Sequence, residues 1–308
     1  MRAFVIITPA HNEEEFIANT IESMLSQTMR PLRWVIVNDG SIDGTRTVVE
    51  RFLTHSFIRL VNIERREGRH FGMKAEAFRR GLLELNDISY DYIGNLDADI
   101  SLRPDYFESI LNEFERDRSL GLAGGIVYTK MGETFVTQDK TLDSVGGAVQ
   151  LFRRSCFEQV GGYISLEFGG IDAAAEITAR MKGWRVRKFL NCRVYEHRRT
   201  GTASAHPFAA RVKEGRRFHS LGYGVLFYFL RCLYRAKDRP LFLGSAAAFY
   251  GFLESIFRGR PIVLPREVVQ YLREEQRQKL RAILGIAKQC HTRRPGAKPY
   301  YDSTAPLI

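Results

Sequence analysis

Short β-rich runs alternate with helical patterns along the first 128 residues of the chain. This alternation predicts an α/β fold in which a largely parallel sheet carries helices on both faces. In such sheets, ligands bind beyond the carboxyl ends of the strands. The predicted strands cover residues 4–8, 34–38, 58–63, 92–96 and 122–128, and the predicted helices cover residues 14–27, 45–55 and 105–116.

Three of the predicted strands end in polar sequence. TPAHNEE follows the first strand, NDGSIDGT the second and LDAD the fourth. Because parallel strands end at one edge, we expect these segments to lie close together. Asp97 and Asp99 project to the same side, roughly 6–7 Å apart along the backbone, and would repel each other unless a cation or solvent separated them. A solvated turn is the alternative, since Asp is common where strands end.

No glycine-rich phosphate loop is present, because neither a Walker sequence nor G-x-G-x-x-G follows any predicted strand. A bound diphosphate would therefore need another source of positive charge. Mg²⁺ and Mn²⁺ are commonly held by one or two carboxylates, while substrate phosphates and water complete the coordination shell. Asp97 and Asp99 are accordingly predicted to bind one of these ions.

Charge is distributed unevenly along the 308 residues, whose net charge is +11. Residues 198–308 carry 21 Lys and Arg against 7 Asp and Glu, whereas residues 1–197 carry 25 against 28. The basic region predicts a polyanionic partner, either nucleic acid or an anionic membrane. No signal peptide is recognisable at the N-terminus, so we expect a cytoplasmic protein. The four cysteines show neither metal-ligand spacing nor a C-x-x-C pair, which predicts reduced thiols.

Two apolar stretches in the basic region, residues 220–230 and 240–253, are bordered by arginines. Each is shorter than the roughly 20 residues that span a bilayer. Their aromatic content favours helices lying in the interface of an anionic membrane, on the cytoplasmic face of the inner membrane. Helices packed on the rest of the protein, including at a dimer contact, are the alternative. Nucleic acid is disfavoured because no recognition module is visible. Residues 266–284 are predicted to form an amphipathic helix, and residues 289–308 a mobile tail.

The ordered motifs resemble those of family 2 glycosyltransferases, which have the Rossmann-like GT-A fold and use nucleotide-sugar donors. The resemblance begins with TPAHNEE, VNDGSIDGT and LDAD and continues through the acceptor-side loop at 151–163, the catalytic segment at 169–184 and VYEHRRTGTA at 194–203. It implies a catalytic domain over residues 1–203, with a donor half to about residue 100 and an acceptor half from residue 101. A helical extension would cover 204–288 and the tail 289–308.

The resemblance also implies donor-site roles. UDP-, GDP- or dTDP-linked sugars are the expected donors, with Asp99 as direct metal ligand and Asp97 near the ribose or the metal. Arg198 and Arg199 would suit a diphosphate. Four positions have a simpler alternative: a helix N-terminal acid for Glu13, a turn residue for Asp39, a solvated surface charge for Lys74 and a surface or core histidine for His197. The remaining donor-site predictions are Pro9, Ala10, His11 and Glu13 for the nucleotide, Asp39 for its base, Lys74 in the 68–74 loop for phosphate and His197 for the metal or diphosphate.

Inversion by direct displacement needs a base beside the acceptor hydroxyl. Asp172 matches that position, although the family usually has a Glu-Asp pair there and this chain has Ile171 before the Asp. Glu176, one helical turn later, is the fallback. The alternative for Asp172 is a helix N-cap that plays no chemical part.

Taken together, the resemblance implies transfer of a single sugar to a hydroxyl of a saccharide or lipid-linked acceptor in bacterial polysaccharide or envelope glycan synthesis. The Q-x-x-R-W sequence of processive synthases is absent, which favours one sugar per encounter. A polyprenyl-phosphate sugar synthase is a second possibility, because its ionised phosphate acceptor needs no base. A catalytically inactive GT-A scaffold is a third, suggested by Ile171.

Overall fold

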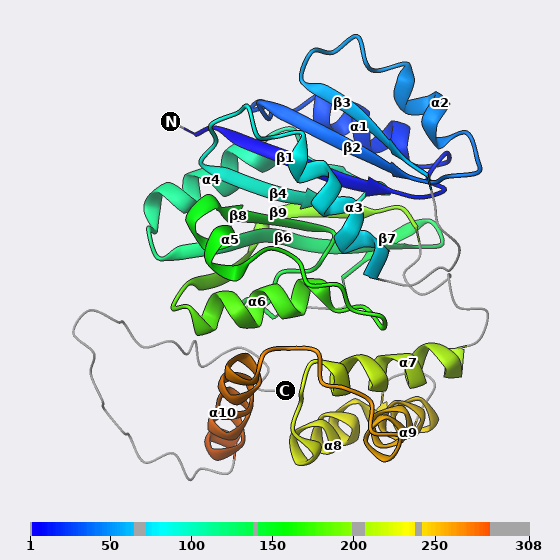
Figure 1. Cartoon of the computed structure of the whole chain (residues 1–308), viewed down its shortest axis with the longest axis vertical. Coiled ribbons are helices and arrows are strands. Elements are labelled where there is room, and N and C mark those ends of the chain that lie inside the picture. The colour runs from blue at the N-terminus through cyan, green and yellow to red at the C-terminus, as the bar shows by residue number, and fades with distance from the viewer. Residues whose placement is uncertain (1, 65–71, 138–140, 199–206, 238–241, 284–308) are drawn as a thin grey trace. The chain divides into compact units, whose positions relative to one another are not determined.

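A computed structural model describes residues 2–64, 72–137, 141–198, 207–237 and 242–283 (Figure 1). The chain separates into two compact units, Met1–Ala203 and Ser204–Ile308. The first unit contains the sheet, and the described part of the second unit is helical. The predicted tail at 289–308 and residues 68–71 of the predicted donor loop lie outside the described residues.

A single mixed sheet forms the centre of the first unit. Its order is β3-β2-β1-β4-β8-β6-β9-β5, with β7 added to β6. β3, β2, β1 and β4 are parallel, whereas β8 runs antiparallel to both β4 and β6. All five predicted strands are confirmed. The strands are β1 (Phe4–Ala10), β2 (Arg33–Asp39), β3 (Ile58–Ile63), β4 (Tyr92–Leu96), β5 (Ile100–Leu102), β6 (Leu120–Met131), β7 (Thr134–Val136), β8 (Val149–Arg153) and β9 (Arg185–Glu196).

The segment expected to be an acceptor-side loop, residues 151–163, is largely regular structure instead. Val149–Arg153 form β8 between β4 and β6, and Arg154–Val160 form helix α5. Four of the five β8 residues are buried, because the strand lies inside the sheet with neighbours on both sides. β8 therefore interrupts the parallel pairing between β4 and β6, although β6 and β9 are again parallel beyond it. The three polar strand ends lie in the N-terminal parallel part.

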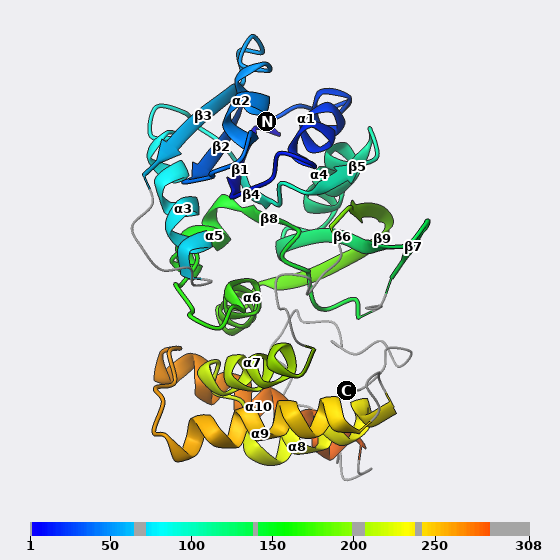
Figure 2. The same ribbon diagram turned by 90° about the vertical axis from the view of Figure 1, so that its right-hand side faces the viewer.

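Helices cover both faces of this sheet (Figure 2). One face carries α1 (Ile17–Leu25), α2 (Thr45–Glu50) and α4 (Tyr106–Arg116), and the other carries α3 (Gly72–Leu83), α5 and α6 (Ile171–Met181). The predicted apolar side of α4 is buried, with the Phe107 ring 4.9 Å from that of Phe4. An aromatic cluster packs beneath α3 and α5, where the rings of Phe78 and Tyr163 meet edge to face at 4.9 Å. Aromatic packing thus fixes helices on both faces of the sheet.

Four longer helices and a short 3-10 turn make up the described part of the second unit. The helices are α7 (Pro207–Ser220), α8 (Val225–Tyr234), α9 (Leu243–Phe257) and α10 (Arg266–Ile283), and the turn is Arg235–Lys237.

Helices α7 and α9 cross closely because glycines occupy the crossing. A Cβ at Gly215 would lie 1.9 Å from the Ala248 carbonyl oxygen, and one at Gly251 would lie 2.1 Å from that of Val212. The two apolar stretches of the sequence become α8 and α9, and the predicted amphipathic helix becomes α10. None of the described helices is both long enough and apolar enough to cross a bilayer.

Candidate active site

The loops that follow β1 and β2 are joined by hydrogen bonds. Asn12 N–H donates to Ser41 Oγ at 3.0 Å, and Glu13 N–H donates to Thr45 Oγ1 at 2.7 Å. His11 Nδ1 lies 2.8 Å from the Asp39 carbonyl oxygen. These contacts bring the predicted donor residues of both loops to one edge of the sheet, together with Pro9 and Ala10, which pair with Val37 and Asn38 at the end of β1.

Asp97 and Asp99 lie in the tight connection between β4 and β5. The Thr20 hydroxyl of α1 lies 2.8 Å from the Ala98 carbonyl oxygen and 2.7 Å from that of Ile100. Asp97 N–H donates to the Ala148 carbonyl at 2.8 Å, and the Asp99 carbonyl accepts from His197 N–H at 2.8 Å. Thr20, the Ala148 carbonyl and His197 N–H therefore fix the backbone of this connection. These contacts do not use the two carboxylates, which can interact with other groups of the site.

Several carboxylates crowd together at this point. Burial raises the pKa of Glu13 to about 8, and Asp99 adds to the shift while Arg198 opposes it. Burial likewise raises the pKa of Asp99 to about 7, with further contributions from Asp97 and Glu196. Mutual repulsion among partly buried acids marks a place where added positive charge is stabilising.

Two cations partly neutralise the cluster. Arg198 NH2 lies 2.5 Å from Glu13 Oε2 and donates to the Asn12 carbonyl at 3.1 Å, and its Nε lies 3.8 Å from Asp99 Oδ2. Lys74, in the first turn of α3, forms an ion pair with Asp97. Burial works to lower the pKa of Lys74, but Asp97 outweighs it and the pKa is raised. Lys74 is thus part of the acidic site and not an isolated surface charge.

The carboxylates suit a divalent ion that takes part of its coordination from substrate. Among the described residues, no three His, Cys, Asp or Glu side chains form a ready-made metal group. Mg²⁺ usually binds through one or two carboxylates and completes its shell with phosphate oxygens and water. Asp97 and Asp99 are two carboxylates that could hold such an ion, and burial together with the charge of Asp97 raises the pKa of Asp99.

His197 lies at the end of β9, beside the β5 edge. Its Nε2 is 2.9 Å from Ser101 Oγ, and its ring packs edge to face against Phe135. Burial, with a contribution from Lys130, lowers the pKa of His197. The metal role of His197 stays a prediction, whereas the neighbouring Arg198 directly contacts the acidic cluster. Arg198 was expected beside a diphosphate, and its ion pair with Glu13 was not foreseen from the sequence.

Asp172 lies inside the first turn of α6. The helix begins at Ile171 with Gly170 at the N-cap position, so the interpretation of Asp172 as an N-cap is wrong. Its carboxylate packs on Gly147, where a Cβ would lie 3.1 Å from Oδ2. Within the described ranges, this carboxylate forms neither a hydrogen bond nor an ion pair. Its negative charge nevertheless contributes to the raised pKa of Lys74. Asp172 is therefore a carboxylate available for chemistry near Asp97.

Glu176, one turn later on α6, is differently placed. It is buried, and its Oε1 accepts a hydrogen bond from Val145 N–H at 2.6 Å. Its Oε2 lies 3.7 Å from Arg180 NH1. Through these contacts, Glu176 holds the backbone at Val145 against α6.

The segment Val145–Ala148, here called the anchor loop, connects α6 to the β4–β5 connection. Asn95 Nδ2 donates to the Gly147 carbonyl at 2.8 Å, and the Ala148 carbonyl accepts from Asp97 N–H. Gln150 Nε2 donates to the Val145 carbonyl at 3.1 Å. Sequence reasoning missed Asn95 and Gln150, and the only available signal was a polar side chain within each apolar strand. The anchor loop thus contacts both the backbone of Asp97 and the side chain of Asp172.

The pH dependence of folding tests the burial of Glu176. Burial raises its pKa from 4.5 to about 8, with Arg180 opposing the shift and Asp172 adding to it. Because the folded chain binds this proton more tightly than the unfolded chain, the free energy of unfolding falls as pH rises between these two values. Glu176→Gln keeps an acceptor for Val145 but cannot ionise. Between about pH 5 and pH 8, we expect the free energy of unfolding of this variant to fall less than that of the parent protein, by on the order of 3 kcal/mol.

Urea unfolding of both proteins at about pH 5 and pH 8 measures this difference. Glu167→Gln, which changes an exposed acid close by in the sequence, is the control and should follow the parent protein. Equal pH slopes for the parent and Glu176→Gln would contradict the assignment of Glu176 as a buried acid.

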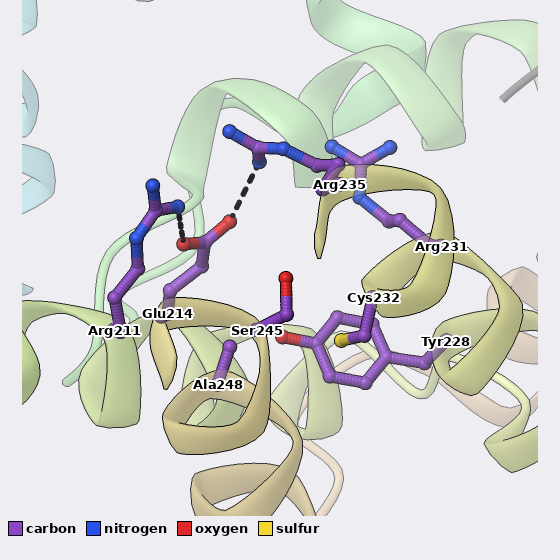
Figure 3. Close-up of a pocket in the computed structure, with 9 residues that line it drawn as sticks. Arg211, Glu214, Tyr228, Arg231, Cys232, Arg235, Ser245 and Ala248 are labelled. Carbon is purple, nitrogen blue, oxygen red and sulfur yellow. Dashed lines mark hydrogen bonds and ion pairs between the residues drawn. The ribbon is translucent and has the colours of Figure 1, made fainter. Parts of the chain in front are cut away.

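The cavity drawn in Figure 3 is lined by residues of the second unit. Glu214 lies between Arg211 and Arg235, with ion-pair distances of 2.9 Å and 3.0 Å. The cavity volume is about 20 Å³. That volume holds about one water molecule and excludes a nucleotide sugar.

Comparison with solved structures shows the fold to which this protein belongs. Over 92% of this chain and 81% of the other, it resembles the mannosyltransferase PcManGT from Pyrobaculum calidifontis in complex with GDP-Man and Mn²⁺, with a TM-score of 0.54 and 17% identity. Over 92% of this chain and 86% of the other, it resembles S. aureus TarS 1-349 in complex with UDP-GlcNAc, with a TM-score of 0.53 and 15% identity. The fold is thus that of the GT-A glycosyltransferases, as the sequence predicted.

The family follows from the sequence match to a family model. The model of glycosyl transferase family 2 matches residues 5–167, more than half of the chain, so the protein belongs to this family. The predicted family is confirmed.

Curated relatives share this part of the chain. Chondroitin synthase of Escherichia coli is 34% identical over 125 residues, which are 40% of this chain and 16% of that protein. Poly-beta-1,6-N-acetyl-D-glucosamine synthase of Staphylococcus aureus (strain COL) is 22% identical over 206 residues, or 61% of this chain and 48% of that protein. The chain spans less than half the length of either relative.

Proposed function

We propose that this protein transfers a single sugar, with inversion, from a nucleotide-diphosphate sugar to a hydroxyl of a saccharide or lipid-linked acceptor. The observation that carries the proposal is the Asp172 carboxylate, which has no hydrogen-bond or ion-pair partner in the described ranges and whose charge reaches Lys74, the partner of Asp97. A base and a diphosphate-binding cluster in one site are the two parts that displacement at a sugar carbon requires.

The donor nucleotide occupies the joined loops after β1 and β2 in this proposal. Glu13 binds the ribose, and Asp39 reads an edge of the base, as the family resemblance implies. The diphosphate then lies near Lys74 and Arg198. Arg198 can exchange its pairing with Glu13 for a charge-assisted hydrogen bond to a phosphate oxygen.

Asp99 and Asp97 would hold a Mg²⁺ or Mn²⁺ ion with the diphosphate. Such an ion would stabilise the charge that develops on the departing nucleoside diphosphate. Support comes from the raised pKa of Asp99 and from the structural neighbours, of which PcManGT was solved with GDP-Man and Mn²⁺ and TarS with UDP-GlcNAc.

The chemical step is a direct displacement. The acceptor oxygen forms a bond to the anomeric carbon as the bond from that carbon to the diphosphate oxygen breaks, which inverts the configuration. The hydroxyl proton passes to Asp172, and the bonding electrons leave with the nucleoside diphosphate. The hydrogen bond between Glu176 and Val145 and the packing of Asp172 on Gly147 support this role, because they tie α6 to the loop that also contacts Asp97.

We place this activity in bacterial polysaccharide or envelope glycan synthesis. The two synthases matched in sequence make glycan polymers by name, and the absence of Q-x-x-R-W favours one sugar per encounter for this chain.

Thermal unfolding with a panel of nucleotide sugars and Mn²⁺ tests donor binding. A donor at about 100 times its Kd stabilises the folded protein by about 2.7 kcal/mol. For a unit of this size, that corresponds to an increase in Tm of roughly 5–10 °C. We expect one nucleotide class to give this increase and the others little. No increase with any UDP-, GDP- or dTDP-sugar at saturating concentration would overturn the proposed donor class.

A further inference from the structure

Helix α8 of the second unit has one apolar side packed inside and another apolar side exposed. Tyr228 and Cys232 are buried against the rest of the unit. The opposite side of the helix is exposed, with Leu226 at 63%, Phe229 at 40% and Leu233 at 54%. Residues spaced by three and four positions share one side of a helix, so these three form a continuous stripe.

Helix α9 carries a second exposed stripe. Leu243, Tyr250 and Phe257 recur every seven residues and are 61%, 62% and 84% exposed. The rings of Phe229 on α8 and Phe249 on α9 lie 5.3 Å apart, which joins the two helices. We call the six residues of the two stripes the apolar face. An exposed surface formed by several large apolar side chains marks an interaction site.

A groove between the start of α8 and α10 continues from the apolar face. Its volume is about 340 Å³, and its walls include Val225, Leu226 and Leu280. Arg273 and Arg277 also line it. Arg273 donates to the Gly222 carbonyl at 3.0 Å, and Arg277 lies 2.9 Å from Glu274. Apolar walls bordered by arginines suit a ligand with a hydrocarbon part and an anionic part.

The charge around the apolar face decides what kind of partner fits it. Between Glu214 and Glu254, residues 215–237 and 242–253 contain no Asp or Glu. Asp238, the single acid in this interval, lies outside the described residues. Arg216 pairs with Glu254 and Arg235 with Glu214, but the interval as a whole keeps a net positive charge. A second copy would bring the same net positive charge against this face and is disfavoured, whereas an anionic surface complements it. The Lys and Arg residues of the interval are Arg216, Arg217, Arg231, Arg235, Lys237 and Arg239, of which the side chains of the first four are described.

We propose that the apolar face and the adjoining groove bind the surface of an anionic phospholipid bilayer. The exposed side chains of α8 and α9 enter the boundary between headgroups and acyl chains, and the surrounding arginines attract anionic headgroups. Because none of the described helices is long and apolar enough to cross a bilayer, both helices lie along its surface. This binding does not depend on the proposed sugar transfer.

Co-sedimentation of the full chain with vesicles tests the proposal. We expect binding to vesicles that contain phosphatidylglycerol and at least ten-fold weaker binding to vesicles of phosphatidylcholine alone. Binding should also weaken when salt rises from about 0.1 M to 1 M, because screening reduces the electrostatic part. The triple variant Leu226→Gln, Phe229→Gln and Leu233→Gln should lose about a hundred-fold in partitioning.

The matched control is Leu32→Gln, Leu53→Gln and Leu83→Gln, which removes three exposed apolar side chains from the first unit. It should bind vesicles like the parent protein. Arg273→Gln with Arg277→Gln should weaken binding to anionic vesicles and reduce its salt dependence. The single variant Leu226→Gln changes a highly exposed side chain and repeats the test if the triple variant fails to fold.

Thermal unfolding with the nucleotide sugar separates this proposal from the catalytic one. Donor stabilisation that is unchanged in a variant with lost vesicle binding would support a separate membrane surface. Absence of vesicle binding by the parent protein at low salt would overturn the proposal, even if the donor still binds. A dimer in sedimentation velocity that the triple variant dissociates, without vesicle binding, would assign the apolar face to self-association instead.

Discussion

Asp172→Asn is expected to lower kcat by about 10³-fold, since a positioned general base contributes 10²- to 10⁴-fold. Asn is close to Asp in size, so the packing against Gly147 should remain. The change removes the acceptor for the hydroxyl proton and leaves the carboxylates of the donor site in place. Steady-state kinetics with saturating donor and acceptor, together with donor binding by calorimetry, measures both parts. Donor affinity should change less than about three-fold.

Glu167→Gln is the matched control for this experiment, because Glu167 is an exposed acid in the segment before α6. Its kcat should equal that of the parent protein. Near-normal turnover in Asp172→Asn would contradict the hydroxyl-acceptor mechanism and favour a phosphate acceptor, as in a polyprenyl-phosphate sugar synthase. If donor binds the parent protein but neither transfer nor hydrolysis occurs with any acceptor tested, the inactive-scaffold hypothesis gains support.

Asp99→Asn should have the second large effect, through the metal. We expect it to weaken the Mn²⁺-dependent part of donor binding by about 100-fold or more, because one of two carboxylate ligands is lost. Asp97→Asn should have a smaller effect on the metal, since Asp97 also pairs with Lys74. Calorimetry of nucleoside diphosphate binding, with and without Mn²⁺, separates the metal-dependent part for each variant.

Asp105→Asn provides the comparison, because Asp105 is an exposed acid near the end of β5 that pairs with Arg103 at 3.3 Å. It should leave metal-dependent binding unchanged. If Asp97→Asn proved more damaging than Asp99→Asn, the division of roles between the two acids would be reversed. Donor binding that is equally strong with and without Mn²⁺ in the parent protein would argue against a metal role for either acid.

Local patterns were enough to predict the part of the fold that holds the donor site. The runs at 4–8, 34–38 and 92–96 are apolar, β-branched or aromatic and end in polar residues, and they became β1, β2 and β4 of the parallel region. Strand ends are local features, so Asp97 and Asp99 could be placed together without a structure. Strand β8 could not, because an antiparallel strand between β4 and β6 depends on pairing across the sheet.

The remaining parts of the site depend on contacts between residues far apart in the sequence. The Arg198–Glu13 pair joins the end of β9 to the loop after β1. Glu176 was considered as a fallback base because it follows Asp172 by one helical turn, but its hydrogen bond to Val145 could not be foreseen from that spacing. Helical periodicity shows which residues lie on the same side of a helix. It does not show which backbone group from another segment will form a hydrogen bond with them.

The anchor loop also has a consequence for how substitutions within it are interpreted. Its backbone groups form hydrogen bonds with the side chains of Glu176 and Asn95 and with Asp97 N–H. A Cβ at Gly147 would lie 3.1 Å from Asp172 Oδ2. A substitution in this loop would therefore displace the proposed base and a proposed metal ligand together, so that a loss of activity there would not identify a residue that contacts substrate.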